Sequence, residues 1–291
     1  MIEIKNITKR YGKKTAVSGI SLELGEGIYG LLGPNGAGKS TLINILVTAL
    51  SPTKGEVLYN GMDIRNKKSG YLGDLGFLPQ NPRFYKNYTA EEFLKYMVAL
   101  KNVHGDIDKK IDELLEFVNL SQEKKNKIGT FSGGMIQRIG VAQAMINDPK
   151  IVIFDEPTAG LDPKERIRFR NLLSEISKNR TVILATHIVP DVEYIANHVI
   201  LLSHGKVIKN ETPHKLMQSI EGHVWALTVE ADKIESYITK YNISNAYREG
   251  NIYKLRIVSD EKPHERAEIF SPTLEDVFLY YCGGENETAE I

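Results

Sequence analysis

The protein has 291 residues, of which 42% are hydrophobic, and 37 Lys and Arg residues balance 37 Asp and Glu residues. Zero net charge disfavours a nucleic acid or an anionic membrane surface as the partner, because both attract a basic excess. The lone cysteine, Cys282, excludes an intrachain disulfide, and no apolar run approaches the ~18 residues that suggest a membrane span. We expect a soluble, intracellular chain with one large domain and a small one.

Residues 1–32 are typical of short strands with hairpin turns, and the last of these strands is followed by a glycine-rich loop and a helix. Ile28 to Leu32 is a short apolar run typical of a buried parallel strand, and Lys39 to Leu50 has apolar residues on one helical face. Between them, Gly33 to Thr41 reads GPNGAGKST, the pattern of a phosphate-binding P-loop. Its glycines let backbone amides approach a phosphate, Lys39 would reach the β- and γ-phosphates, and the Ser40 hydroxyl would bind Mg²⁺.

A hairpin and a long helical stretch follow. Residues 56–64 contain Asn60-Gly61, which favours a hairpin turn, and the pattern from about residue 84 to residue 148 is mainly helical. In that stretch, Glu91 to Leu100 and Ile107 to Leu120 carry apolar residues at helical spacing. Phe131 to Met135 reads FSGGM and precedes a predicted helix from Met135 to Asn147, so it forms a second anion site.

Two acids end the next predicted strand. The apolar run from Ile151 to Phe154 is followed by Asp155 and Glu156, and open α/β sheets bind ligands at the carboxyl ends of their strands. An acid at this place can bind Mg²⁺, and its neighbour can deprotonate a water molecule. Together, the P-loop, the FSGGM loop and this strand predict that the chain binds a nucleoside triphosphate.

Strands and helices alternate from residue 150 to residue 210, and the character of the sequence changes after Gly222. His223 to Glu230 and Ile252 to Val258 are typical of strands, and Ala231 to Tyr241 is typical of a helix. Pro272 to Leu279 predicts a further helix with a Thr or Pro start. We expect the last eight residues, which are polar and acidic, to be disordered.

These motifs resemble those of the ATP-binding subunits of ABC transporters over roughly residues 1–215. The P-loop matches the Walker A motif, Ile151 to Glu156 matches Walker B with its catalytic glutamate, and FSGGM is similar to the signature Leu-Ser-Gly-Gly-Gln. Other matches are Gln80 in the Q-loop, His187 as the switch histidine, Asp162 in the D-loop and Tyr11 as the aromatic residue that stacks on adenine.

The resemblance implies ATP as substrate and Mg²⁺ as cofactor. It implies Glu156, His187, Gln80 and Lys39 as catalytic residues, and Ser40, Gln80 and Asp155 as metal ligands. The implied nucleotide contacts are Tyr11, Gly33, Pro34, Asn35, Gly36, Ala37, Gly38, Lys39, Ser40, Thr41, Ser132, Gly133 and Gly134.

Several of these residues also have a purely structural interpretation. Tyr11 fits a surface hairpin, Gln80 a turn cap, His187 a strand end and Asp162 a helix N-cap. The signature glutamine is replaced by Met135, which removes a side-chain donor but leaves the hydroxyl and backbone donors of the loop.

The resemblance also implies the fold and the assembly. We expect an α/β fold of the P-loop NTPase class, with an ABC ATPase domain at residues 1–220 that includes an antiparallel β subdomain and a helical subdomain at about 84–148. A small α/β accessory region would span residues 221–291. Two ATPase subunits, identical or paired, would bind ATP between the P-loop of one and the signature of the other. A separate transmembrane permease would hold them at the inner face of the cell membrane.

The direction of transport is predicted from the C-terminal region. Leu274 to Phe278 is similar to a segment of exporter ATPases, so we expect ATP hydrolysis that drives export. Two alternatives remain: an importer ATPase, and a non-transport ABC ATPase acting on nucleic acid or ribosomes. The single cassette disfavours the latter, and we expect no nucleic-acid partner. Phe84, Tyr85 and Tyr88 either line the docking groove for the permease or belong to the core.

Overall fold

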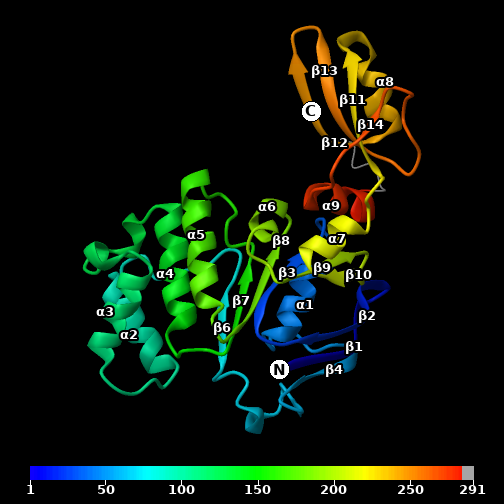
Figure 1. Ribbon diagram of the computed structural model, residues 1–291. Coiled ribbons are helices and arrows are strands. Elements are labelled where there is room, and N and C mark those ends of the chain that lie inside the picture. The colour runs from blue at the N-terminus through cyan, green and yellow to red at the C-terminus, as the bar shows by residue number, and fades with distance from the viewer. Residues whose placement is uncertain (284–291) are drawn as a thin grey trace.

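The computed structural model describes residues 1–283, and the predicted disorder of the last eight residues lies outside this range. The described residues form three β-sheets, and Figure 1 shows the third of them standing apart from the rest of the molecule. In the described part, no helix is long and apolar enough to cross a membrane.

A six-stranded sheet is central to the fold and has the order β10-β9-β3-β8-β7-β6. All neighbours run parallel except β10, which is antiparallel to β9. In every strand except the edge strand β10, alternate residues face different apolar clusters, so these strands are buried on both sides and their sequences are mostly apolar. The strands are β3 (Gly27–Leu32), β6 (Leu75–Leu78), β7 (Ile151–Asp155), β8 (Thr181–Thr186), β9 (His198–Ser203) and β10 (Lys206–Glu211).

The strand order places the motif residues at one edge of this sheet. Because β8 lies between β3 and β7 and all three are parallel, their carboxyl ends meet. Leu32 is opposite Thr186, and Asp155 is opposite Ala185. The P-loop, the two acids and His187 therefore follow three adjacent strand ends.

An antiparallel sheet of order β2-β1-β4-β5 covers one side of the central sheet. It comprises β1 (Ile2–Tyr11), β2 (Lys14–Leu24), β4 (Lys54–Tyr59) and β5 (Met62–Asp63), which confirms the predicted N-terminal strands and the hairpin. The hairpin turn has positive φ at both central residues, 50° at Asn60 and 80° at Gly61, as a type I′ turn requires.

The predicted helices form with shifted ends. Helix α1 (Lys39–Leu46) ends four residues before the predicted Leu50, because the backbone turns left-handed at Thr48 with φ 61°. Helix α3 (Ile107–Phe117) ends three residues before the predicted Leu120, since Asn119 has φ 53°. The other two predicted helices between residues 84 and 148 are α2 (Ala90–Leu100) and α4 (Gly133–Met145).

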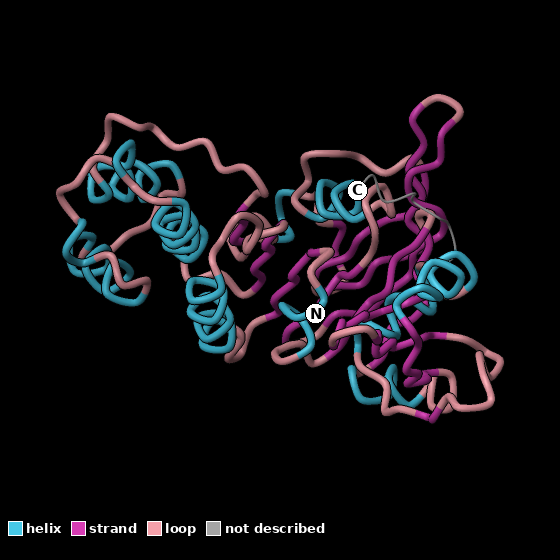
Figure 2. Tube along the Cα trace, turned by 90° about the horizontal axis from the view of Figure 1, so that it is seen from above, coloured by secondary structure: helices cyan, strands magenta, loops and turns pink. Residues whose placement is uncertain are grey.

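Helices α2, α3 and α4 form a group at one side of the molecule, with α5 (Pro163–Ile176) beside α4 (Figure 1), and α4 packs directly on β6. Figure 2 shows the same group from above, beside the strands. The apolar faces of these helices join the cluster that covers the second side of the central sheet. Two short helices, α6 (Val189–Glu193) and α7 (Pro213–Gln218), complete this side.

The third sheet, of order β12-β13-β11-β14, has an apolar cluster of its own. The predicted strands appear as β11 (Val224–Glu230) and β13 (Ile252–Val258), and the predicted helix divides into a 3₁₀ turn (Ala231–Lys233) and α8 (Ile234–Lys240). Strands β12 (Asn242–Glu249) and β14 (Glu268–Ile269) were not predicted, because their mostly exposed side chains do not alternate between apolar and polar.

The last described helix, α9 (Leu274–Cys282), returns to the first part of the chain. Thr273 caps it in a capping box with Asp276, so the predicted Thr start is confirmed. Leu274 and Val277 are fully buried in the cluster that covers the central sheet. The Leu274 amide also donates a hydrogen bond to Glu193 Oε1 of α6 at 3.3 Å. Helix α9 thus packs on the central unit, although it follows the third sheet in the sequence.

Candidate functional site

The loop from Gly33 to Thr41 connects β3 to α1 in a conformation that requires glycine. A Cβ atom on Gly33 would lie 2.3 Å from the Leu202 carbonyl oxygen, and Gly38 combines φ 104° with a Cβ position 2.6 Å from the Ala16 carbonyl oxygen. Gly38 is also the N-cap of α1 and provides no side-chain cap. The first amides of α1 are therefore free of a side-chain acceptor, which is the arrangement that binds an anion at a helix N-terminus.

A pocket of about 570 Å³ lies over this loop. It brings together Tyr11 from the end of β1, Gln80 after β6 and Glu156 after β7. Tyr11 is 50% exposed, and Lys9 Nζ lies 5.4 Å from its ring centroid. The other lining residues are Lys14, Thr15, Ala16, Pro34, Asn35, Gly36, Ala37, Gly38, Lys39, Ser40, Thr41, His204 and Gly205.

Lys39 and Glu156, which line the pocket, form a buried charged group with Asp155. Lys39 Nζ donates hydrogen bonds to the Gly33 carbonyl oxygen at 2.6 Å and to the Pro34 carbonyl oxygen at 3.2 Å, and lies 3.9 Å from Glu156 Oε1. Burial lowers the pKa of Lys39, and this effect outweighs the negative charges of Glu156 and Asp155, which raise it. Burial and then the charge of Glu156 raise the pKa of Asp155 to about 6.

The Asp155 carboxylate has the properties of a cation ligand. Its Oδ1 atom is buried and has no hydrogen-bond partner among residues 1–283. Such an acceptor is costly unless a donor or a cation satisfies it, and hard cations such as Mg²⁺ select oxygen ligands. Ser40 and Gln80 line the adjoining pocket and are both exposed. The residues present therefore fit Mg²⁺.

Glu156 is held by the segment that follows β8. His187 Nδ1 lies 2.9 Å from Glu156 Oε1, and the Thr186 hydroxyl donates to Glu156 Oε2 at 3.2 Å. The backbone of Glu156 is left-handed, with φ 47°, which is uncommon for a residue with a side chain. Its amide donates to the Ala185 carbonyl oxygen at 2.8 Å, so the neighbouring strand stabilises this turn. Glu156 is 5% exposed, and a carboxylate so placed can accept a proton from a water molecule in the pocket.

The FSGGM loop does not contribute to this pocket. Ser132 caps α4 by accepting a hydrogen bond from the Met135 amide at 3.3 Å, and Ser132 and Gly133 are exposed. A Cβ atom on Gly134 would lie 2.8 Å from Glu165 Oε2, so a side chain at this position would displace Glu165. Met135 packs partly buried against the apolar cluster. Asp162 is the N-cap of α5 and accepts from the Glu165 amide at 2.9 Å.

The three predicted aromatic residues separate into two environments. Phe84 packs against the apolar core, with its ring centroid 5.0 Å from that of Phe93. Tyr85 and Tyr88 are exposed and stack on each other, and both contact Tyr96 edge-on. The partly buried Phe84 therefore fits the core alternative, while Tyr85, Tyr88 and Tyr96 form an exposed aromatic cluster.

Sequence reasoning missed part of the pocket wall. His204 and Gly205 were predicted only as a turn, yet both line the pocket. Gly205 has φ 75°, and a Cβ atom there would lie 2.6 Å from the Ala16 carbonyl oxygen. The His-Gly turn between two predicted strands was a signal of a tight turn, but nothing in it indicated the approach to the P-loop.

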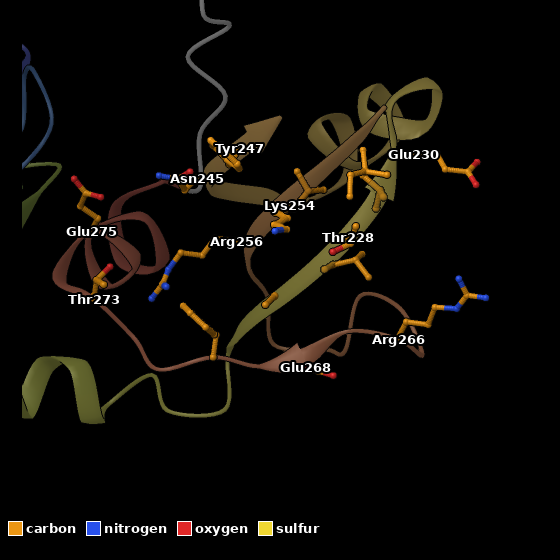
Figure 3. A pocket seen from close by; sticks show the side chains of 16 residues that line it. Thr228, Glu230, Asn245, Tyr247, Lys254, Arg256, Arg266, Glu268, Thr273 and Glu275 are labelled. Carbon is orange, nitrogen blue, oxygen red and sulfur yellow. The ribbon is translucent and has the colours of Figure 1, made fainter. Parts of the chain in front are cut away.

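A larger pocket, of about 840 Å³, lies on the open face of the third sheet (Figure 3). Thr228, Lys254 and Arg256 line it from neighbouring strands, together with Tyr247 and Phe270. None of the predicted nucleotide contacts lies there. Two of its cations are already paired, since Lys254 Nζ contacts Glu249 at 2.6 Å and Arg256 Nε contacts Asp276 at 2.9 Å. The smaller pocket over the P-loop is therefore the candidate site, because it contains the convergent charged groups.

Known proteins share these features. The family model described as ABC transporter matches residues 17–159. The linearmycin resistance ATP-binding protein LnrL of Bacillus subtilis (strain 168) is 36% identical over 76% of this chain and 72% of its own length. The Nod factor export ATP-binding protein I of Rhizobium sp. (strain N33) is 31% identical, and the match covers 98% of both chains.

A solved structure gives the fold. The dimeric structure of MJ0796, a bacterial ABC transporter cassette, is 29% identical with a TM-score of 0.66, and the match covers 73% of this chain and 98% of that one. The predicted fold class, a P-loop core with antiparallel, helical and C-terminal extensions, is confirmed. On these similarities, the chain belongs to the family of ABC transporter ATP-binding proteins.

Proposed function

We propose that this chain is the ATP-binding subunit of an exporter and hydrolyses ATP to drive transport through a separate membrane permease. The observation that carries the chemistry is the placement of Glu156 in one pocket with the P-loop, with its carboxylate held by His187 at 2.9 Å. Glu156 would take the proton of the water molecule that attacks the γ-phosphate. His187 would orient Glu156 and contact the γ-phosphate.

The remaining pocket residues would bind and orient the nucleotide. Tyr11 would stack on the adenine ring, and the amides of the loop from Gly33 to Thr41 would surround the phosphates. Lys39 would exchange its two carbonyl partners for the β- and γ-phosphates. Ser40, Gln80 and Asp155 would hold Mg²⁺, which would neutralise negative charge on the β- and γ-phosphates.

A second subunit would complete the site. Ser132, Gly133 and Gly134 lie outside the pocket of their own chain, and two of them are exposed. Their hydroxyl and amide groups at the start of α4 are donors suited to phosphate. A head-to-tail dimer, homomeric or with a paired ATPase subunit, would bring them to the partner's nucleotide. The similarity to the dimeric MJ0796 cassette supports this assembly.

Export through a permease at the inner face of the cell membrane is supported by the name of one relative, the Nod factor export protein, whose match extends over the C-terminal region. The formal net charge of zero gives no support to a nucleic-acid partner. The exposed cluster of Tyr85, Tyr88 and Tyr96 on the helical side offers an apolar surface for a permease segment.

The test is co-purification from native membranes. Wild-type chain should bring down an integral membrane protein, and Tyr85→Asp should reduce the amount recovered without changing basal ATPase activity. Tyr247→Asp serves as control, because Tyr247 is a 62% exposed tyrosine on the third sheet. Recovery of ribosomes or DNA with no integral membrane protein would contradict the transport function.

A further inference from the structure

A second connection between the Glu156 and His187 segments lies away from the pocket. The Thr158 hydroxyl donates a hydrogen bond to Asp191 Oδ2. Thr158 follows Glu156 by two residues, and Asp191 follows His187 by four residues within α6. Thr158 is 1% exposed and Asp191 2% exposed, so water competes little for this bond.

The burial of the Asp191 carboxylate costs free energy of folding. Asp191 is buried, and among residues 1–283 it forms no ion pair, so a neutral hydroxyl is the side-chain partner that satisfies it. Burying a charged group with a neutral partner costs free energy that an apolar side chain of similar size would not cost. Packing alone therefore does not explain an aspartate beside Thr158.

The bond joins two turns that carry the reacting groups. On one side, the Leu161 amide donates to the Thr158 carbonyl oxygen at 3.1 Å, and the Ala159 amide donates to that of Glu156 at 3.3 Å. On the other side, the Asp191 amide donates to the Ile188 carbonyl oxygen at 3.1 Å. The Ile188 amide donates to the Thr186 hydroxyl at 3.0 Å. Each partner is thus fixed within the turn that holds Glu156 or His187.

We propose that Thr158 and Asp191 are positioning residues, which keep the segment of Glu156 and the segment of His187 in one relative geometry. Glu156 is held by bonds to the end of β8 and to His187, and the Thr158–Asp191 bond adds a second connection between the segments that follow β7 and β8. This inference rests on the proposed function, in which Glu156 is the general base. The same bond also connects the turn that leads to Asp162, so the D-loop would be held with the switch histidine.

Two substitutions at Thr158 separate hydrogen bonding from packing. Thr158→Val keeps the shape and removes the hydroxyl, while Thr158→Ser keeps the hydroxyl and removes the methyl group. Positioning through the bond predicts that kcat falls roughly 10- to 100-fold in the valine variant and is close to wild type in the serine variant. The affinity of both variants for a non-hydrolysable ATP analogue in the presence of Mg²⁺, measured by calorimetry, should equal that of the wild type. A valine variant with normal kcat and a defective serine variant would overturn the proposal in favour of packing.

A double variant separates an effect on stability from an effect on positioning. Thr158→Val leaves the Asp191 carboxylate buried without its partner, which destabilises the fold, whereas Thr158→Val with Asp191→Leu removes both polar groups. We expect the double variant to recover the thermal unfolding temperature but not kcat. Recovery of kcat together with stability would show that the pair acts through stability alone and would overturn the proposal.

Glu156→Gln distinguishes the failure of this inference from that of the proposed function. If Glu156→Gln retains turnover, Glu156 is not the base and the proposed function fails. If Glu156→Gln is inactive while Thr158→Val hydrolyses ATP at the wild-type rate, the general base stands and the positioning role alone is wrong.

Discussion

Glu156 and His187 contact each other across 31 residues of sequence because their strands are neighbours in register. Asp155 of β7 is opposite Ala185 of β8, so the residues that follow each strand emerge side by side. The left-handed turn at Glu156 then directs its carboxylate toward His187 rather than along the strand.

Glu156→Gln should lower ATP turnover at least about 100-fold, because the amide keeps the size of the side chain but cannot accept a proton. ATP should then remain bound and stabilise the dimer. Steady-state hydrolysis and size-exclusion chromatography with ATP and Mg²⁺ measure the two effects. Glu113→Gln, an exposed glutamate of α3, is the control. A variant that is fully active and monomeric would remove Glu156 from the mechanism.

Lys39→Ala should weaken ATP binding roughly 10- to 100-fold, since it removes the charge that faces the β- and γ-phosphates. Calorimetry with ATP and Mg²⁺ measures the affinity, and circular dichroism checks the fold. Lys109→Ala removes a lysine whose side chain is 70% exposed and should have no effect. If Lys39→Ala bound ATP as tightly as wild type, the P-loop interpretation would be wrong.

Ser132→Arg should abolish hydrolysis but leave nucleotide binding at the P-loop of the same subunit nearly intact. The arginine would fill the space where the partner's ATP is expected, while Ser132 is absent from the wall of its own pocket. Hydrolysis and equilibrium binding are measured on the same preparation, with Ser121→Arg at another exposed serine as control. Normal hydrolysis by Ser132→Arg would contradict the signature assignment.

Asp276 predicts a pH dependence of stability. Burial would raise its pKa, but hydrogen bonds from Arg256, Ser244 and Thr273 outweigh burial and hold the pKa below its ordinary value of 3.8. A carboxyl whose folded pKa is lowered stabilises the protein fully above its unfolded pKa and loses this contribution as the pH falls through the folded pKa. Asp276→Asn should therefore reduce the free energy of unfolding by about 3 kcal/mol at pH 7 and by little below the lowered pKa.

Thermal unfolding of the wild type and of Asp276→Asn, measured from pH 7 down to a pH below the lowered pKa of Asp276, tests the prediction. Asp63→Asn is a matched control, because hydrogen bonding to Arg65 also lowers the pKa of Asp63, but on the surface. Its effect should stay within about 1 kcal/mol. A pH-independent loss in Asp276→Asn would show that packing, and not the ion pair, determines the effect.

The sequence predicted what depends on local chemistry. The P-loop, the acids after Phe154 and the cap at Thr273 each follow from a few consecutive residues, and the structure places them as predicted. The Thr158–Asp191 bond was not predicted, because it joins residues 33 positions apart and needs the order of the central sheet. Phe84 and Tyr85 are adjacent and both aromatic, so only tertiary packing shows that Phe84 packs partly buried against the core while Tyr85 is exposed.

The return of α9 to the central unit has a consequence for synthesis of the chain. Leu274 and Val277 fill positions in the main apolar cluster, yet the ribosome adds them after all the nucleotide-binding motifs. A nascent chain that already contains the P-loop, both acids and the FSGGM loop still exposes the surface that α9 covers. Because domains begin to fold as they emerge, this surface stays uncovered until α9 has been synthesised. Prematurely terminated chains therefore carry every nucleotide motif but present an open apolar patch to chaperones and proteases.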